Sequence, residues 1–196
     1  MRLVLTGDSI TAAGRDLADA TDLGTGYAAR VAAGLPDAEV VNTGVNGHRV
    51  PDLQERWERD VLAHEPDVVS LMVGVNDMWR RYTRQQVSPV ARFEAGYRDL
   101  LTRTRAAGVD RIIVLEPFLL PVRDEQWSWR ADLDEKIAAV RRLAREFDAE
   151  LVATDGPMAQ AGSLVGVDAL VRDGVHPTAQ GHDLLARHWL AAYRAR

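Results

Sequence analysis

The sequence of 196 residues predicts an α/β fold, a three-layer α/β/α sandwich built on a five-stranded parallel sheet. Two observations predict this class. Short apolar segments alternate with amphipathic helical segments along the whole chain, which is the pattern of a parallel sheet covered on both faces. A hydrophobic fraction of 46% and a charged fraction of 27% are typical of a chain that buries a full core. The length suits one domain, which we expect to span residues 1–196.

Five short segments are the predicted strands, and the third has the clearest pattern. Residues 67–73 form a nearly continuous apolar run, which is typical of a central strand buried on both faces. The other predicted strands are 2–6, 39–42, 111–115 and 150–153. Right-handed crossovers restrict the topology, and we expect the strand order 2-1-3-4-5. The carboxyl ends of the first three strands then meet at the switch point, where ligands bind in open α/β sheets.

The helices are predicted from apolar residues at helical spacing between the strands. Pro51 opens one such segment, in which apolar residues including Trp57 recur at intervals of four. Ser88 and Pro89 have the composition of a helix start. The arginine-rich stretch 79–84, which follows the third strand, is predicted to be a mobile loop.

Composition and charge exclude several classes of function. The net charge is −5 and the arginines are spread along the chain, so we expect no nucleic-acid partner. The chain has no cysteine, which excludes disulfides, thiolate chemistry and zinc–cysteine sites. No segment approaches the roughly 20 apolar residues that span a bilayer, and no signal peptide is visible. We therefore expect no membrane partner and a cytoplasmic location, although a leader removed earlier would not show here. A homo-oligomer stays open, but no apolar stripe indicates one.

Polar residues follow the first three predicted strands and precede the last helix. Ser9 comes directly after the first strand, Gly47 lies in the loop after the second, and Asn76 follows the third. Asp173 and His176 stand just before the last helix. Each is weak evidence alone, because Gly-Asp-Ser is a common turn composition that also caps helices. Together they are the groups that acyl transfer needs.

The chemistry of acyl transfer explains these residue types. A serine hydroxyl is a poor nucleophile that needs a base, and histidine titrates in the range suited to that role. A carboxylate on Nδ1 holds the imidazole in one tautomer, and one tight turn brings Asp173 back to His176. The oxyanion of the tetrahedral intermediate needs preorganised donors. We expect the backbone N–H groups of Ser9 and Gly47 and the side-chain amide of Asn76 to supply them, with glycine at 47 allowing close approach.

Four sequence blocks, in order, resemble those of the SGNH hydrolases, the superfamily of GDSL-type esterases and lipases. They are Gly-Asp-Ser-Ile at 7–10, Asn-x-Gly-x-x-Gly at 42–47, Gly-x-Asn-Asp at 74–77 and Asp-x-x-His at 173–176. The isoleucine in the first block replaces the usual leucine, a mild change at a packing position. The resemblance implies a flavodoxin-like fold. It implies Ser9 as nucleophile, His176 as base, Asp173 as the residue that orients it, and Gly47 with Asn76 as oxyanion donors. Gly44 is the alternative to Gly47.

The resemblance predicts a serine esterase that works through an acyl-enzyme without metal or cofactor. No long apolar lid is visible, which favours short acyl groups, and segments 23–27 and 116–118 resemble those of bacterial members linked to carbohydrate deacetylation. We expect an acetyl-type esterase whose partner is a small-molecule or carbohydrate ester. A thioesterase or lysophospholipase is the alternative within the class, and a non-catalytic glycan-binding module is the alternative outside it. A third alternative is a nucleotide- or flavin-binding protein, but the sequence lacks the Gly-rich phosphate-binding loop of such proteins.

Aromatic residues in the loops after the strands are candidate walls of a substrate pocket. Trp79, Phe118 and Trp127 are the main candidates, and Trp129 is a further one. His48 directly follows Gly47, so it is a candidate to line the site.

Charged residues near the predicted site have two interpretations each. Asp8 is another candidate substrate-binding residue, but we expect it to hold its turn by backbone hydrogen bonds. Asp8 is also an alternative candidate for a metal ligand, but no carboxylates or histidines stand near it in the sequence with the spacing of a metal site. Arg80 and Arg81 could contact an anionic substrate, although a solvated charge run is the favoured interpretation. His182 in the last helix is expected to be a packing or surface residue.

Overall fold

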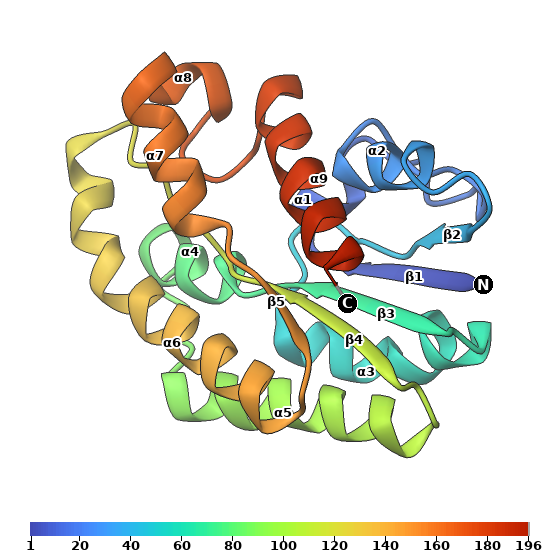
Figure 1. Cartoon of the computed structure of the whole chain (residues 1–196). Coiled ribbons are helices and arrows are strands. Elements are labelled where there is room, and N and C mark those ends of the chain that lie inside the picture. Colours follow the sequence, from blue (N-terminus) through green and yellow to red (C-terminus); the bar gives the residue numbers. More distant parts are fainter. Residues whose placement is uncertain (196) are drawn as a thin grey trace.

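The computed structural model of the chain describes residues 1–195 and has the predicted three-layer arrangement (Figure 1). One five-stranded sheet has the strand order β2-β1-β3-β4-β5, and every neighbouring pair is parallel. The predicted fold class and strand order are therefore confirmed. The strands are β1 (Arg2–Gly7), β2 (Glu39–Asn42), β3 (Val68–Met72), β4 (Arg111–Leu115) and β5 (Glu150–Val152).

Helices cover both faces of the sheet. Figure 1 shows α2 (Tyr27–Ala33) and α9 (Ala179–Arg194) on one face, and α3 (Val50–Asp60) and α5 (Val90–Ala106) on the other. The long helix α6 (Arg130–Glu146) contributes buried side chains to the core on both sides. The shorter helices are α1 (Ser9–Ala12), α4 (Val75–Arg84), α7 (Asp155–Val165), α8 (Val167–Leu170), η1 (Leu62–His64) and η2 (Asp124–Trp129).

The alternation of side chains along the strands divides the core into two clusters. In β1, Leu3 and Leu5 pack on the side of α2 and α9, whereas Val4 packs on the side of α3 and α5. Trp189 of α9 and Trp57 of α3 are fully buried, one in each cluster. Fully burying one such apolar side chain stabilises the fold by roughly 1.5–3 kcal/mol, so the two faces hold the sheet between the helix layers.

The arginine-rich stretch after β3 is helical, so the prediction of a mobile loop is wrong. Residues 79–84 complete α4, in which Val75 and Met78 are buried in the core and Trp79 and Tyr82 are half-buried against it. These residues follow the three- and four-residue spacing of a helix, which the intervening arginines obscure. Helix α5 begins at Val90 without a side-chain cap.

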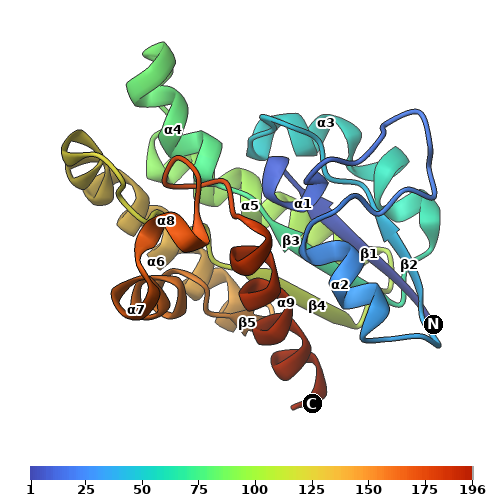
Figure 2. The ribbon, with the colours of Figure 1, turned by 90° about the horizontal axis from the view of Figure 1, so that it is seen from above.

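The carboxyl edge of the sheet requires a glycine where β1 meets β3. Gly7 ends β1 with φ +156°, and a Cβ at this position would lie 2.0 Å from the carbonyl oxygen of Met72. Only glycine lets the two strands approach this closely and lets the chain turn into α1. Figure 2 shows that α1, α4 and the segment leading into α9 lie on the same side of the molecule. Within residues 1–195, none of the helices has the length and apolar character needed to cross a membrane.

Candidate active site

Ser9 is the first residue of α1, directly after the turn that ends β1. The carboxylate of Asp8 caps this short helix by accepting a hydrogen bond from the N–H of Ile10 at 3.0 Å. The hydroxyl Oγ of Ser9 lies 2.9 Å from Nε2 of His176, although 167 positions separate the two residues. The sheet topology therefore brings together a hydroxyl and an imidazole as a nucleophile and its base would require.

Asp173 holds the imidazole of His176 from the other side. Its Oδ2 lies 2.7 Å from Nδ1 of His176, and its Oδ1 accepts the backbone N–H groups of Val175 at 3.1 Å and His176 at 2.9 Å. Burial alone would raise the pKa of Asp173, but the hydrogen bonds from His176 and from the two N–H groups lower it to about 2. The hydrogen bond to this ionised carboxylate raises the pKa of His176, against the opposing effect of burial. The imidazole thus has a fixed orientation and increased basicity.

A buried amide that sequence reasoning missed anchors the loop carrying Asp173. Gln126 of η2 is fully buried, and its Nε2 donates to the carbonyl of Asp173 at 2.7 Å. Its Oε1 accepts the N–H groups of Val122 at 2.8 Å and Arg123 at 3.2 Å. Gln126 therefore ties the loop after β4 to the loop before α9. A glutamine in an irregular segment has no motif, so no sequence signal could have found this contact.

The Asn-x-Gly-x-x-Gly block shapes the loop after β2. Asn42 donates through Nδ2 to the carbonyls of Thr11 at 2.8 Å and Leu23 at 2.9 Å, and its Oδ1 accepts the N–H of Gly44 at 2.9 Å. The N–H of Gly44 is therefore already engaged, which favours Gly47 over Gly44 as an oxyanion donor. Gly47 has φ +77°, a left-handed conformation that glycine adopts without strain.

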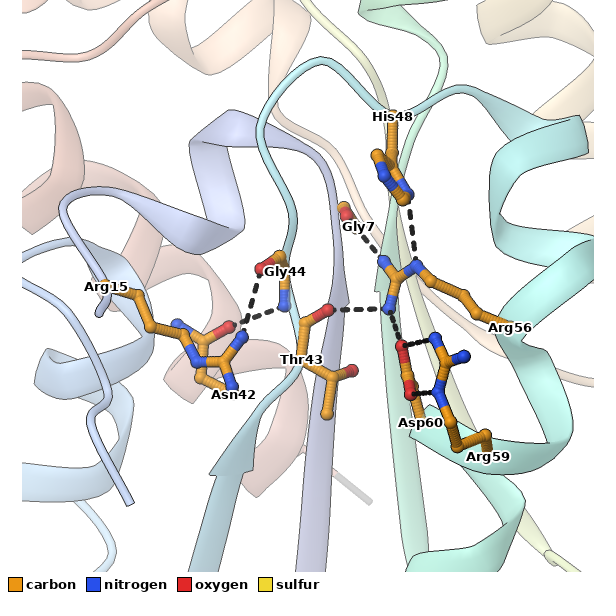
Figure 3. Close-up of polar contacts among 9 residues, drawn as sticks. All are labelled: Gly7, Arg15, Asn42, Thr43, Gly44, His48, Arg56, Arg59 and Asp60. Atoms are coloured by element: carbon orange, nitrogen blue, oxygen red, sulfur yellow. Dashed lines mark hydrogen bonds and ion pairs between the residues drawn. The ribbon is translucent and has the colours of Figure 1, made fainter. Parts of the chain in front are cut away.

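Arg56 of α3 joins the end of β1 to the loop that follows β2 (Figure 3). This arginine is only 4% exposed, and it donates to the carbonyls of Gly7 at 3.1 Å and Thr43 at 2.8 Å. It also donates to Nδ1 of His48 at 3.1 Å and pairs with Asp60 at 3.2 Å. Burial, with the nearby Arg56 charge, lowers the pKa of His48, so its ring is neutral and accepts this bond. Arg56 thus fixes the two ends of the segment that contains Gly47.

One cavity of about 720 Å³ collects the candidate catalytic groups. Ser9, Gly47, Asn76 and His176 all line it. The side-chain amide of Asn76, in the first turn of α4, donates to the carbonyl of His48 at 3.2 Å. An amide group carries two N–H bonds, so one remains available to a ligand. The remaining lining residues are Ala13, Gly14, Thr25, Arg30, Asn46, Trp79, Arg80, Arg84, Arg172, Pro177, Ala179 and His182.

Two buried carboxylates lie behind this cavity. Asp8 is 1% exposed, and burial raises its pKa to about 7; its Oδ2 has no hydrogen-bond partner among the described residues. Burial also raises the pKa of Asp77 to about 6, although Asp77 accepts the hydroxyl of Ser88 at 3.0 Å and the N–H of Val50 at 3.3 Å. Both carboxylates hold backbone in place. Within residues 1–195, no three His, Cys, Asp or Glu side chains group in a way that could hold a metal ion.

The predicted aromatic walls have three different outcomes. Trp79 lines the cavity, as expected of a wall residue. Phe118 is fully buried in the core, so its prediction as a substrate-binding residue is wrong, and Trp129, 7% exposed, stacks on Tyr82 instead. Trp127 is 64% exposed and is not among the residues that line the cavity. These aromatic residues all lie in similar polar segments of the sequence. Their different burial therefore depends on how each packs against the rest of the chain.

Of the two histidines near the site, His182 lines the cavity and His48 does not, the reverse of what the sequence predicts. His48 binds Arg56 and is not among the cavity-lining residues, contrary to the expectation that it lines the site. His182 lines the cavity although it is 7% exposed, and its Nδ1 accepts the N–H of Tyr27 at 3.2 Å. Burial lowers the pKa of His182 to about 4, with a further contribution from Arg30, so this ring is neutral.

Comparison with known proteins decides the family. A model of the GDSL-like Lipase/Acylhydrolase family matches residues 5–184. An acetylxylan esterase from Geobacillus stearothermophilus is 36% identical over 204 residues, which cover 96% of this chain and 92% of that protein. The chain belongs to the GDSL-like lipase/acylhydrolase family. It is therefore a carboxylic ester hydrolase, and the SGNH resemblance of its four blocks is confirmed.

Solved structures of family relatives share the fold. The crystal structure of the Geobacillus acetylxylan esterase superposes with a TM-score of 0.88 at 36% identity, over 97% of this chain and 93% of that one. LAE5, an α/β hydrolase enzyme from the metagenome of Lake Arreo in Spain, has a TM-score of 0.89 at 32% identity. That alignment covers 97% of this chain and 94% of LAE5. The sheet and the helices that surround the cavity are thus common to these hydrolases.

Proposed function

We propose that this hydrolase is a serine esterase that removes acetyl and other short acyl groups from esters of carbohydrates. One observation carries the proposal: Asp173, His176 and Ser9 form a continuous hydrogen-bonded chain that ends at the cavity. The acetylxylan esterase relative at 36% identity supports the acetyl preference and the carbohydrate substrate. The family domain is proposed to occupy residues 1–196 as one unit.

The proposed reaction has two steps. Oγ of Ser9 attacks the ester carbonyl while Nε2 of His176 takes its proton, and collapse of the tetrahedral intermediate breaks the bond to the sugar oxygen, which leaves with that proton. Water then attacks the acyl-enzyme, gives a proton to His176, and releases the carboxylic acid as the Ser9 hydroxyl is restored. Asp173 stays ionised throughout, and it stabilises the imidazolium formed in each step.

The proposed oxyanion hole consists of the N–H groups of Ser9 and Gly47 and the side-chain amide of Asn76. Support comes from their common cavity, from the engaged N–H of Gly44, and from the spare N–H of the Asn76 amide. Loss of one such donor typically costs on the order of a hundredfold in turnover. Arg80 donates to the carbonyl of Gly47 at 2.5 Å, which holds the proposed donor loop against α4.

The lining of the cavity supports short acyl groups. Trp79 is the one large apolar side chain among the described residues that line it, and most of the others are polar or charged. A long fatty chain needs an extended apolar wall, since each buried CH₂ contributes about 0.8 kcal/mol. This lining argues against the hydrolysis of long-chain thioesters and lysophospholipids.

The deciding experiment measures hydrolysis of p-nitrophenyl acetate by the wild type and by Ser9→Ala from about pH 5 to 9. We expect wild-type turnover that is lost in the folded variant, and a preference for acetyl over octanoyl esters. Labelling of the wild type by a fluorophosphonate, absent in Ser9→Ala, checks the nucleophile directly. A folded wild type that shows neither turnover nor labelling would instead support the glycan-binding alternative.

A further inference from the structure

The cavity carries a positive charge that the proposed deacetylation does not need. Its described lining contains no aspartate or glutamate, although the whole chain has a net charge of −5. The arginines that line it are Arg30, Arg80, Arg84 and Arg172. A protein that is acidic overall therefore has a locally cationic substrate cavity.

Three of these arginines have no carboxylate partner among residues 1–195. The side chains of Arg84 and Arg172 are exposed and make no hydrogen bond or ion pair with any residue in the described part of the chain, although the backbone N–H of Arg172 donates to the carbonyl of His176 at 2.9 Å. Arg80, one helical turn before Arg84 in α4, is hydrogen-bonded to the Gly47 carbonyl. Arg30, in contrast, is paired with Asp183. Most arginines elsewhere in residues 1–195 have such partners, whereas three of the four that line the cavity do not.

The field of these arginines reaches the candidate catalytic groups. Burial together with repulsion from Arg49 and Arg84 lowers the pKa of Arg80. Arg172 directly precedes Asp173, and its charge opposes the increased pKa of His176. Asp8 is 1% exposed, and the carboxylate of Asp173 is already engaged by the ring of His176 and by the N–H groups of Val175 and His176. An anionic ligand group is the partner that this arrangement lacks.

Arg172 directly precedes Asp173 in this chain. Solved variants of the acetylxylan esterase show that a tryptophan directly precedes its catalytic aspartate. A tryptophan face suits contact with a neutral sugar ring. A guanidinium instead presents a planar set of donors that matches a carboxylate or a phosphate. An arginine directly before Asp173 is therefore suited to bind an anionic group of the substrate.

We propose that the ester substrate bears an anionic group, a carboxylate or a phosphate, on the sugar that carries the acetyl group, and that Arg84 and Arg172 bind it with support from Arg80. The proposal rests on the esterase function proposed above. It assigns the substrate class as an acetylated acidic sugar, either a uronate-containing oligosaccharide or a sugar phosphate. The anionic group takes no part in the bond changes at Ser9, and its binding places the acetyl group at the nucleophile.

The test compares kcat/KM for three acetylated substrates: a neutral xylo-oligosaccharide, a matching oligosaccharide with one uronic acid, and a sugar phosphate. We expect about a tenfold preference for one of the acidic substrates at low salt, decreasing as added salt screens the charges. Whichever acidic substrate is preferred identifies the anion. Arg84→Gln and Arg172→Gln should each reduce that preference by about three- to tenfold, mainly through KM.

The matched control is Arg92→Gln, because Arg92 is an exposed arginine of α5 that is not among the cavity-lining residues. This variant should keep the wild-type preference. Equal kcat/KM for the neutral and acidic substrates, in a protein that hydrolyses p-nitrophenyl acetate, would overturn the anionic substrate alone. No hydrolysis of p-nitrophenyl acetate and no labelling of Ser9 would overturn the esterase function and this proposal together.

Discussion

Replacing Arg56 with leucine should reduce both the stability and the turnover of the enzyme. The leucine removes the charged donor that the carbonyls of Gly7 and Thr43 and the ring of His48 now share. Hydrogen bonds to charged groups contribute about 1.5–3 kcal/mol each, and the desolvation of a 4% exposed guanidinium offsets part of that sum. We therefore expect a net loss of about 3 kcal/mol, which lowers Tm by roughly 6–12 °C in a protein of this size.

The catalytic effect of Arg56→Leu comes from the loop that carries Gly47. Without Arg56, Thr43 and His48 no longer fix the two ends of that loop, and a displacement of about 1 Å at a catalytic group can cost a hundredfold in rate. We expect kcat to decrease at least tenfold on p-nitrophenyl acetate, with KM changing little. Arg56→Lys keeps the charge but not the planar donor set, so it should recover part of the stability and little of the turnover.

Thermal denaturation followed by circular dichroism, together with the separate measurement of kcat and KM, checks this reasoning. Arg59→Gln is the matched control, because Arg59 lies on the same helix with a 76% exposed side chain that, within residues 1–195, binds only Asp60 (Figure 3). It should change Tm by less than about 2 °C and leave kcat unchanged. A wild-type kcat in folded Arg56→Leu would refute the positioning role. A wild-type Tm in that variant would refute the energetic argument.

Three further predictions concern the carboxylates and the buried amide. Wild-type activity should rise with pH through a pKa above 6.5, because His176 acts as a base in its neutral form. In Asp173→Asn this rise in activity should move to lower pH, and kcat should decrease about 10³- to 10⁴-fold. Rate measurements across the pH range check both predictions. Burial raises the pKa of Asp8 from 3.8 to about 7, so the contribution of Asp8 to the free energy of unfolding decreases as pH rises across this window. Asp8→Asn still caps α1, so it should raise Tm most near pH 8 and least near pH 4. Melting curves at both pH values check this prediction. Gln126→Leu leaves the carbonyl of Asp173 without its hydrogen-bond donor. We expect chemical denaturation to show a decrease of about 2 kcal/mol in the free energy of unfolding, and kinetics to show a lower kcat. Unchanged values would mean that the loop keeps its conformation without Gln126.

Local sequence determined which segments form strands and the identity of the candidate catalytic residues. Each of these features depends on segments of about five residues: an apolar run that forms a strand, followed by polar residues at its carboxyl end. The parallel topology then places Ser9, Asn76 and His176 at one edge of the sheet, whatever the loops do in detail. These features can be predicted from the sequence because each depends only on residues that are neighbours along the chain.

The tertiary structure alone decided the contacts between distant segments. Phe118 and Trp79 follow strands in similar surroundings, yet one is buried in the core and the other lines the cavity, because packing against helices from elsewhere in the chain separates them. Arg56 and Gln126 have no motif, since their role depends on carbonyls that folding brings within 3.1 Å of their side chains. The positive charge of the cavity likewise arises only when α4 and the loop before α9 meet, because the arginines are spread along the sequence and their field depends on distance in space.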